Sequence, residues 1–213
     1  MAKFSLYFLL LLSSHYMLVI ANSDPTNFIK TSCRATRYPA LCIQCLSTYA
    51  STIRQSELQI AQVALAVSLS RARSASNFIS KLAKRRGRKQ RGYQATKDCI
   101  EIMGDTVYQL RLSIKELGGM RRRFAGQDFA WHISNVQTWV SAALTNENTC
   151  LDGFSGPAMN GNAKAAIRKR VLNVARVTSN ALALVNRFAD RHRGEETKNC
   201  LEKSRSCKRG VCF

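Results

Sequence analysis

The chain contains eight cysteines, and their chemistry depends on their spacing and on the redox state of the compartment in which the protein is located. Cys33, Cys42 and Cys45 lie close together in TSCRATRYPALCIQC, and the last two form a C-x-x-C pair. In a reducing compartment such a pair indicates a redox couple or half of a zinc site, whereas the cysteines of exported proteins form disulfides. The compartment therefore decides which chemistry applies.

The first residues, MAKFSLYFLLLLSSHYMLVIANS, have the layout of a secretory signal peptide. Lys3 gives a short positive start, an apolar run follows, and the small residues Ala21 and Ser23 end it. The alternative is an uncleaved membrane anchor, but His15 and neighbouring serines interrupt the run. We expect residues 1–23 to be removed and residues 24–213 to be secreted without a membrane anchor. We expect no metal site, because no second C-x-x-C exists and histidines number only three.

Four long runs with helical apolar spacing predict an all-α protein, an up-down-up-down four-helix bundle. These runs are residues 56–82, 93–117, 128–144 and 162–191, with Ser56 and Asp128 as expected caps and Gly118-Gly119 ending the second. The clearest stripe is Ile167, Val171, Val174, Thr178, Ala181, Val185 and Phe188.

The domain map follows from these runs. Residues 26–51 are too short and too interrupted by Pro39 for another long helix, so they predict a short helical hairpin ahead of the bundle at 56–191. Together they form one domain, residues 24–191. The tail, residues 192–213, is basic and lacks a stripe, and we expect it to be poorly ordered unless its three cysteines tie it down. These are Cys200, Cys207 and Cys212.

Several disulfide pairings remain open. A bond between Cys33 and Cys42 would staple the hairpin and is worth ~2–3 kcal/mol in the chain-entropy model. Cys99 lies on one predicted helix and Cys150 at the end of the next, and a bond between them would be worth ~4 kcal/mol. Cys45 would remain a buried thiol or pair with the tail. Sequence alone does not fix the connectivity.

The chain contains no G-x-S-x-G, H-E-x-x-H or phosphate loop, and His132 and His192 are isolated. We therefore expect neither an enzyme nor a cofactor. The formal net charge of +20 favours an anionic partner, and outside the cell this excludes nucleic acid in favour of acidic polysaccharides, membrane surfaces or acidic proteins.

The segments SCRATRYPALC, KDCIEIMGDTVYQL, NVQTWVSAALTNENTCLDGF and VTSNALALVNRF, in this order, resemble the plant invertase and pectin methylesterase inhibitor family. The similarity is greatest to its secreted 21 kDa-type members, which are grouped with pectinesterase inhibitors. The resemblance implies a four-helix bundle behind a hairpin, disulfides Cys33–Cys42 and Cys99–Cys150, and a free Cys45.

The same resemblance implies a function in the apoplast or cell wall. A pectinesterase inhibitor docks non-covalently over the pectin-binding cleft of pectin methylesterase, as a monomer in a one-to-one complex. Contacts in the family come from the middle helices of the bundle and include Thr149 and Asp152. The alternative is that neither residue contacts a partner: Asp152 is then a solvated turn residue, and Thr149 only fills the end of the helix.

Two further functions stay open. An invertase inhibitor shares the scaffold, but the Pro-Lys-Phe element of that type is missing from the turn at 153–159. The second of these functions is that of a cationic protein that binds pectin or the cell wall. One basic segment, expected in a loop, suggests anionic pectin as a second ligand; it also fits a solvated loop or a dibasic protease site. Its cations are Lys84, Arg85, Arg86, Arg88, Lys89 and Arg91.

Overall fold

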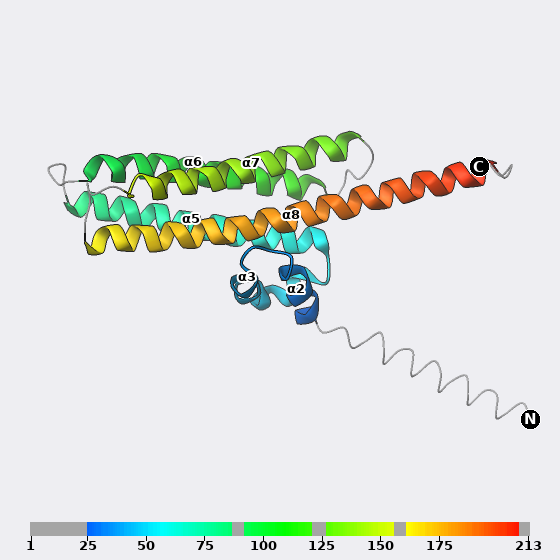
Figure 1. Ribbon diagram of the computed structural model, residues 1–213, viewed down its shortest axis with the longest axis horizontal. Coiled ribbons are helices and arrows are strands. Elements are labelled where there is room, and N and C mark those ends of the chain that lie inside the picture. Colours follow the sequence, from blue (N-terminus) through cyan, green and yellow to red (C-terminus); the bar gives the residue numbers. More distant parts are fainter. Residues whose placement is uncertain (1–24, 87–91, 121–126, 156–160, 209–213) are drawn as a thin grey trace, which may run out of the picture.

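The computed structural model describes residues 25–86, 92–120, 127–155 and 161–208, which are helical with short turns and contain no strand. Three short helices and a 3₁₀ turn come first: α2 (Pro25–Cys33), α3 (Pro39–Leu46), η1 (Ser47–Tyr49) and α4 (Ala50–Ile53). Four long helices follow and alternate in direction: α5 (Glu57–Arg86), α6 (Tyr93–Gly119), α7 (Gln127–Asp152) and α8 (Asn162–Lys208) (Figure 1). The predicted four-helix bundle behind a short hairpin is confirmed. The predicted signal peptide lies outside the described residues.

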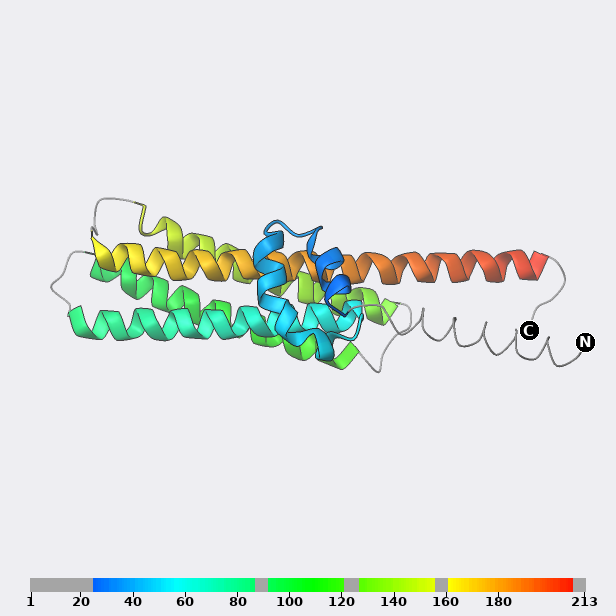
Figure 2. The same cartoon turned by 90° about the horizontal axis from the view of Figure 1, so that it is seen from below.

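Each long helix packs against two others, and the four helices form two pairs that make up the two sides of the bundle. Helix α6 packs on α7 and α5 packs on α8, while α5–α6 and α7–α8 contacts join the two pairs. The N-terminal hairpin contacts α5 and α8 through α3 and lies across part of that pair (Figure 2). The α6–α7 pair therefore forms the side of the bundle away from the hairpin.

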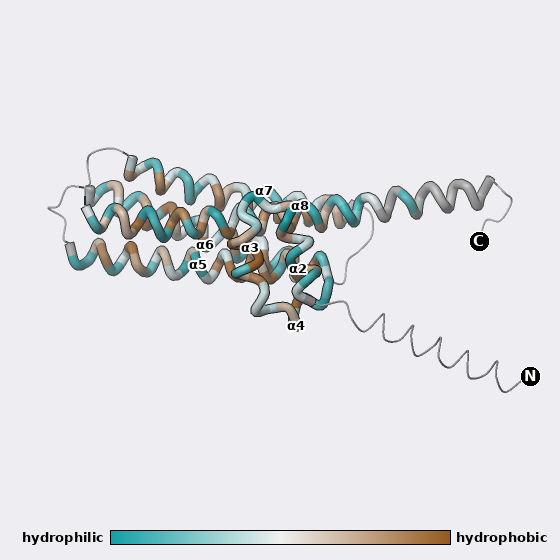
Figure 3. The backbone as a smooth tube through the Cα atoms, turned by 60° about the horizontal axis from the view of Figure 1, so that its bottom comes forward, coloured by the Kyte–Doolittle hydropathy of each residue, from teal (hydrophilic) through white to brown (hydrophobic). Residues whose placement is uncertain are grey.

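The stripes predicted for α6, α7 and α8 face the core, and Figure 3 shows hydrophobic residues recurring along the long helices. Every residue of the α8 stripe, from Ile167 to Phe188, is buried. The α5 stripe was predicted less well, because Leu58 and Leu69 are only partly buried whereas Ile60 and Ser68 lie fully inside. Small residues such as Ala64 and Ala72 occupy much of this inner face, which lets neighbouring helices approach closely.

Helix ends agree with the predictions at two places and differ at others. The Ser56 hydroxyl accepts a 3.3 Å hydrogen bond from the Gln59 backbone N–H and so caps α5, and α6 ends at Gly119. The cap predicted at Asp128 is wrong, because α7 begins at Gln127 and places this residue in the first turn. A carboxylate there still interacts favourably with the positive end of the helix dipole.

The last helix is longer than predicted. Helix α8 continues through the predicted tail to Lys208, and Figure 1 shows it projecting beyond the bundle. Among the described residues, His192 is the last aromatic ring that packs on the bundle, with its centroid 3.8 Å from that of the Phe129 ring. Residues beyond it are mostly good helix formers and include no proline, so an apolar stripe is not required for the helix to continue.

One buried amide ties the hairpin to the bundle. The Asn180 side chain on α8 accepts a 3.0 Å hydrogen bond from the Tyr38 backbone N–H and donates a 2.9 Å bond to the Tyr38 carbonyl. Asn180 is 3% exposed, so little water can replace it. The hairpin is therefore positioned by a side chain distant from it in sequence.

We expect Asn180→Ala to lower the free energy of unfolding by roughly 1–2 kcal/mol, because it leaves the backbone N–H of Tyr38 unpaired. The Tyr38 carbonyl keeps its 3.0 Å hydrogen bond from the Cys42 N–H. Urea unfolding at fixed pH measures the loss. The half-buried Asn173 on the same helix supplies the control, and Asn173→Ala should change stability by less than about 0.5 kcal/mol. Equal effects of the two substitutions would contradict the role assigned to Asn180.

Candidate functional site

Thr149 and Asp152 lie on the last turn of α7 and are both exposed. Their spacing of three residues places them next to each other on the helix surface. The Thr149 hydroxyl donates a 3.0 Å hydrogen bond to the Thr145 carbonyl, whereas the Asp152 carboxylate makes no ion pair in the part of the chain that the structure describes. A carboxylate at a helix C-terminus is disfavoured by the helix dipole, so this position does not serve the stability of α7.

The backbone around these two residues is held on three sides. A disulfide joins Cys150 to Cys99 of α6, with 4.8 Å between the Cα atoms. Arg168 of α8 donates a 2.8 Å hydrogen bond from Nη1 to the Leu151 carbonyl, and Phe154 is buried just beyond the helix. The end of α7 is therefore fixed to both neighbouring helices, and its exposed side chains are presented on a rigid backbone.

Glu147 lies two residues before Thr149 on the same helix and was not singled out in the sequence. Its side chain is fully buried, and burial raises the pKa of its carboxyl from an ordinary 4.5 to about 8. The Thr178 hydroxyl on α8 donates a 2.9 Å hydrogen bond to Oε1, while Oε2 has no hydrogen-bond partner among the described residues. Glu147 is therefore protonated at mildly acidic and neutral pH.

The outer face of α7 carries almost no charge. This helix contains no lysine or arginine, although the chain as a whole has 33 of them. Its exposed residues are mainly hydroxyl and amide side chains. They include Ser134, Thr138, Ser141, Thr145, Asn148 and Thr149.

Charge is divided between the two sides of the bundle. Helices α6 and α7 contain seven acidic and three basic residues, whereas α5 and residues 162–189 of α8 contain one acidic and twelve basic residues. Asp98, Glu101 and Asp105 are exposed on the part of α6 that the Cys99 disulfide holds beside the end of α7. The side with Thr149 and Asp152 is therefore the acidic side of a basic protein.

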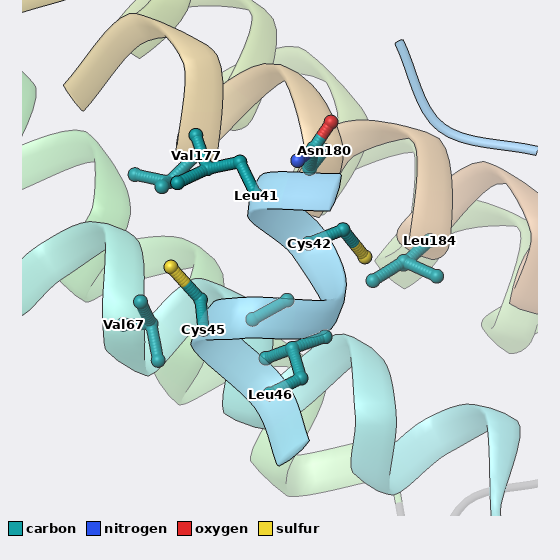
Figure 4. A pocket seen from close by; sticks show the side chains of 9 residues that line it. Leu41, Cys42, Cys45, Leu46, Val67, Val177, Asn180 and Leu184 are labelled. Atoms are coloured by element: carbon teal, nitrogen blue, oxygen red, sulfur yellow. The ribbon is translucent and has the colours of Figure 1, made fainter. Parts of the chain in front are cut away.

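The other predicted residues fall in different places. Cys33 and Cys42 form the second disulfide, with Cα atoms 5.6 Å apart, so the structure contains both pairs that the family resemblance implies. Cys45 is a free, half-buried thiol (Figure 4), beside a notch of about 10 Å³ that it lines with Val67 and Val177. Such a notch holds no more than about one water molecule.

The basic segment is only partly a loop. Lys84, Arg85 and Arg86 belong to the last turn of α5, which corrects the prediction that the loop begins at residue 84. Lys84 and Arg85 are exposed. Arg88, Lys89 and Arg91 lie outside the described residues, as do the side chains of Cys200 and Cys207 and the whole of Cys212.

Neither described histidine belongs to a catalytic arrangement. His132 of α7 contacts the Glu116 carboxylate of α6 through Nδ1, and His192 packs on Phe129. No group of three or more histidine, cysteine, aspartate or glutamate side chains that could hold a metal occurs among the described residues. Within the same residues, every helix is too short or too polar to span a membrane.

Comparisons with known proteins agree on one family. The family described as plant invertase/pectin methylesterase inhibitor matches residues 27–184. Pectinesterase inhibitor 9 of Arabidopsis thaliana is 53% identical over 171 residues, which cover 79% of this chain and 84% of that protein. The 21 kDa protein of Daucus carota is 48% identical over 178 residues, covering 83% of this chain and 92% of that protein.

A solved structure shows the same fold. It is the crystal structure of mutant form A of a pectin methylesterase inhibitor from Arabidopsis, which aligns with a TM-score of 0.60 at 18% identity. The alignment covers 74% of this chain and 95% of that chain. At this level of identity the similarity extends to the arrangement of the helices.

Proposed function

The chain belongs to the plant invertase/pectin methylesterase inhibitor family, and from this premise we propose that it is a secreted inhibitor of plant pectin methylesterase. As a member of an inhibitor family it is not itself an enzyme. It binds its target as a monomer, in a non-covalent one-to-one complex over the cleft that takes pectin. The site of action is the cell wall outside the plasma membrane.

The α6–α7 side is the docking surface in this proposal. The observation that carries it is the exposed Asp152 carboxylate, which is held on a braced helix end and has no ion-pair partner in the described part of the chain. Such a group is available to hydrogen-bond donors of a partner at no structural cost to the inhibitor. Thr149 beside it adds a hydroxyl oxygen.

The division of charge supports docking on this side. A chain with a net charge of +20 would repel a basic enzyme at long range. An interface formed by α6 and α7 instead presents four exposed carboxylates at one end, those of Asp98, Glu101, Asp105 and Asp152, and a hydroxyl-rich neutral stripe. Such a surface complements a basic target locally, and local complementarity determines the strength and register of the complex.

Inhibition of invertase is the second candidate, because the matching family includes inhibitors of both enzymes. The relatives with the highest identity quoted above include a protein named as a pectinesterase inhibitor, and the Pro-Lys-Phe element is missing from residues 153–159. Both observations favour the esterase as target.

Asp152→Asn tests the docking surface with the smallest chemical change. We expect the inhibition constant for pectin methylesterase to rise by about tenfold to a hundredfold, the range for a charged residue at the centre of an interface. The measurement is a titration of methanol release from esterified pectin. Stability should rise slightly, because the substitution removes a negative charge from the helix C-terminus.

Asp190→Asn is the matched control, since it removes an exposed carboxylate from α8 on the other side of the bundle. Its inhibition constant should stay within about twofold of the wild type, as expected for a residue outside the interface. If both variants inhibit as strongly as the wild type, Asp152 is not a contact. Thr149→Ala completes the series and should weaken inhibition less than Asp152→Asn, because it removes a neutral hydroxyl.

A further inference from the structure

A basic groove lies between α5 and α8, next to the hairpin. Its volume is about 540 Å³, and its charged lining residues are Arg71 from α5 and Lys169, Arg170 and Arg176 from α8. The hairpin covers only part of the α5–α8 pair, and Figure 2 shows the two helices continuing side by side beyond it. The groove lies on this part, away from α6 and α7.

The stretches of α5 and α8 that form the groove carry cations and no acidic residues. Residues 58–86 and 162–189 contain twelve lysines and arginines and no aspartate or glutamate. Protein surfaces normally mix both signs, because like charges held close together repel. The four lining cations make no ion pair in the part of the chain that the structure describes. An anionic ligand would relieve this repulsion.

Two of the arginines are held in place by aromatic rings. The Arg170 guanidinium lies 3.6 Å from the centroid of the Phe78 ring on α5, and that of Arg176 lies 5.5 Å from the Tyr38 ring. Cation–π contacts of this kind restrict the side chain while leaving most of its N–H groups available. In Arg170, Nη1 donates a 3.3 Å hydrogen bond to the Ala166 carbonyl of its own helix. The groove therefore has partly ordered donors, and its lining also includes Leu172, an apolar residue that is 38% exposed.

The groove continues along α5 as a line of cations. Arg85 is exposed near the end of α5, fourteen residues after Arg71, and the exposed Lys81 lies between them on a similar side of the helix. At 1.5 Å per helical residue this separation is about 20 Å. The spacing fits an extended chain with repeated negative charges better than a single small anion.

We propose that this groove binds a linear polyuronate, a de-esterified stretch of pectin. The inference rests on the proposed function, because hydrolysis of each pectin methyl ester consumes water and leaves a carboxylate, methanol and a proton. Guanidinium groups pair with such carboxylates in a bidentate fashion. Since the groove and the α6–α7 side face different directions, the inhibitor binds the product polymer and the enzyme at once. It is thereby retained where the enzyme has already acted.

Binding of oligogalacturonate to the purified protein, without enzyme, tests the groove by calorimetry. Affinity should increase with chain length, fall as salt is added, and be lost when the same oligomer is methyl-esterified. Arg71→Gln with Lys169→Gln should weaken binding at least tenfold, because two charge-assisted contacts disappear. Lys30→Gln with Arg34→Gln, on exposed positions of α2 and the turn after it, removes the same net charge as the control.

Each outcome of the calorimetry either supports or overturns binding in the groove. Weaker binding by the groove variant alone supports the site, whereas equal losses in both variants would show that only total charge matters. Absence of binding by the wild type, or equal binding of the methyl-esterified oligomer, overturns the proposal. Tighter binding of polyphosphate of equal charge would indicate an unselective polyanion surface and overturn it as well. Because both groove residues lie away from α6 and α7, the groove variant should still inhibit pectin methylesterase. If the wild-type protein itself does not inhibit the enzyme, the proposed function is refuted, whatever the result for the groove.

Discussion

Glu147→Gln is expected to make the protein more stable by roughly 4 kcal/mol at pH 8 while leaving stability at pH 4 nearly unchanged. The wild-type carboxyl is fully buried against α8, and burial raises its pKa to about 8. Between pH 4.5 and 8 the folded chain keeps a proton that the unfolded chain has released. Raising the pH through this range therefore favours unfolding, and the stability present below pH 4.5 is progressively lost.

Glutamine is neutral throughout and keeps an oxygen that can accept the hydrogen bond from Thr178. Urea unfolding of both proteins at several pH values gives the difference in the free energy of unfolding, in which contributions from other groups cancel. Parallel curves for the two proteins would contradict the assignment. Thr178→Val adds an independent check: because the hydrogen bond from Thr178 lowers the pKa of Glu147, its removal should move the wild-type pH dependence to higher pH.

Cys99→Ala with Cys150→Ala is expected to lower the free energy of unfolding by ~4 kcal/mol. The bond closes a loop between cysteines that are 51 residues apart, so its removal releases much conformational entropy in the unfolded chain. It also joins α6 to the turn that carries Thr149 and Asp152. Inhibition should therefore weaken even under conditions in which the double variant remains folded.

The second disulfide provides the comparison. Cys33 and Cys42 are only nine residues apart, and removing their bond should cost ~2–3 kcal/mol without altering the end of α7. Urea unfolding of both double variants, with an inhibition assay on the fraction that stays folded, separates stability from docking. A loss of less than about 1 kcal/mol on removal of Cys99–Cys150 would contradict the entropic argument.

Much of the fold could be predicted because apolar spacing is a direct consequence of helix geometry. The stripe from Ile167 to Phe188 lies entirely in the core, and the positions of α6 and α7 follow the same rule. In α5 the pattern was ambiguous, since alanines and serines occupy both faces and give little contrast. The helical segment after Arg191 could not be predicted from a stripe, because its apolar residues do not recur at helical spacing.

Glu147 was missed although its spacing was informative. It follows Val136, Val140 and Ala143 at the same helical register, so its position on the buried face could have been read from the sequence. The protonated state depends on how completely α8 covers it, which only packing determines. Likewise, the net charge of +20 gave no indication that the cations gather on α5 and α8, because helix pairing decides which charges share a side.

The most direct test of the central claim is a parallel titration of two enzymes. Purified, oxidised protein comprising residues 24–213 is added at mildly acidic pH to a plant pectin methylesterase and to an acid invertase, and released methanol and glucose are followed. We expect stoichiometric loss of methanol release, complete at one inhibitor per enzyme, with invertase activity unchanged. Loss of invertase activity alone, or of neither activity across several isoforms, would contradict it.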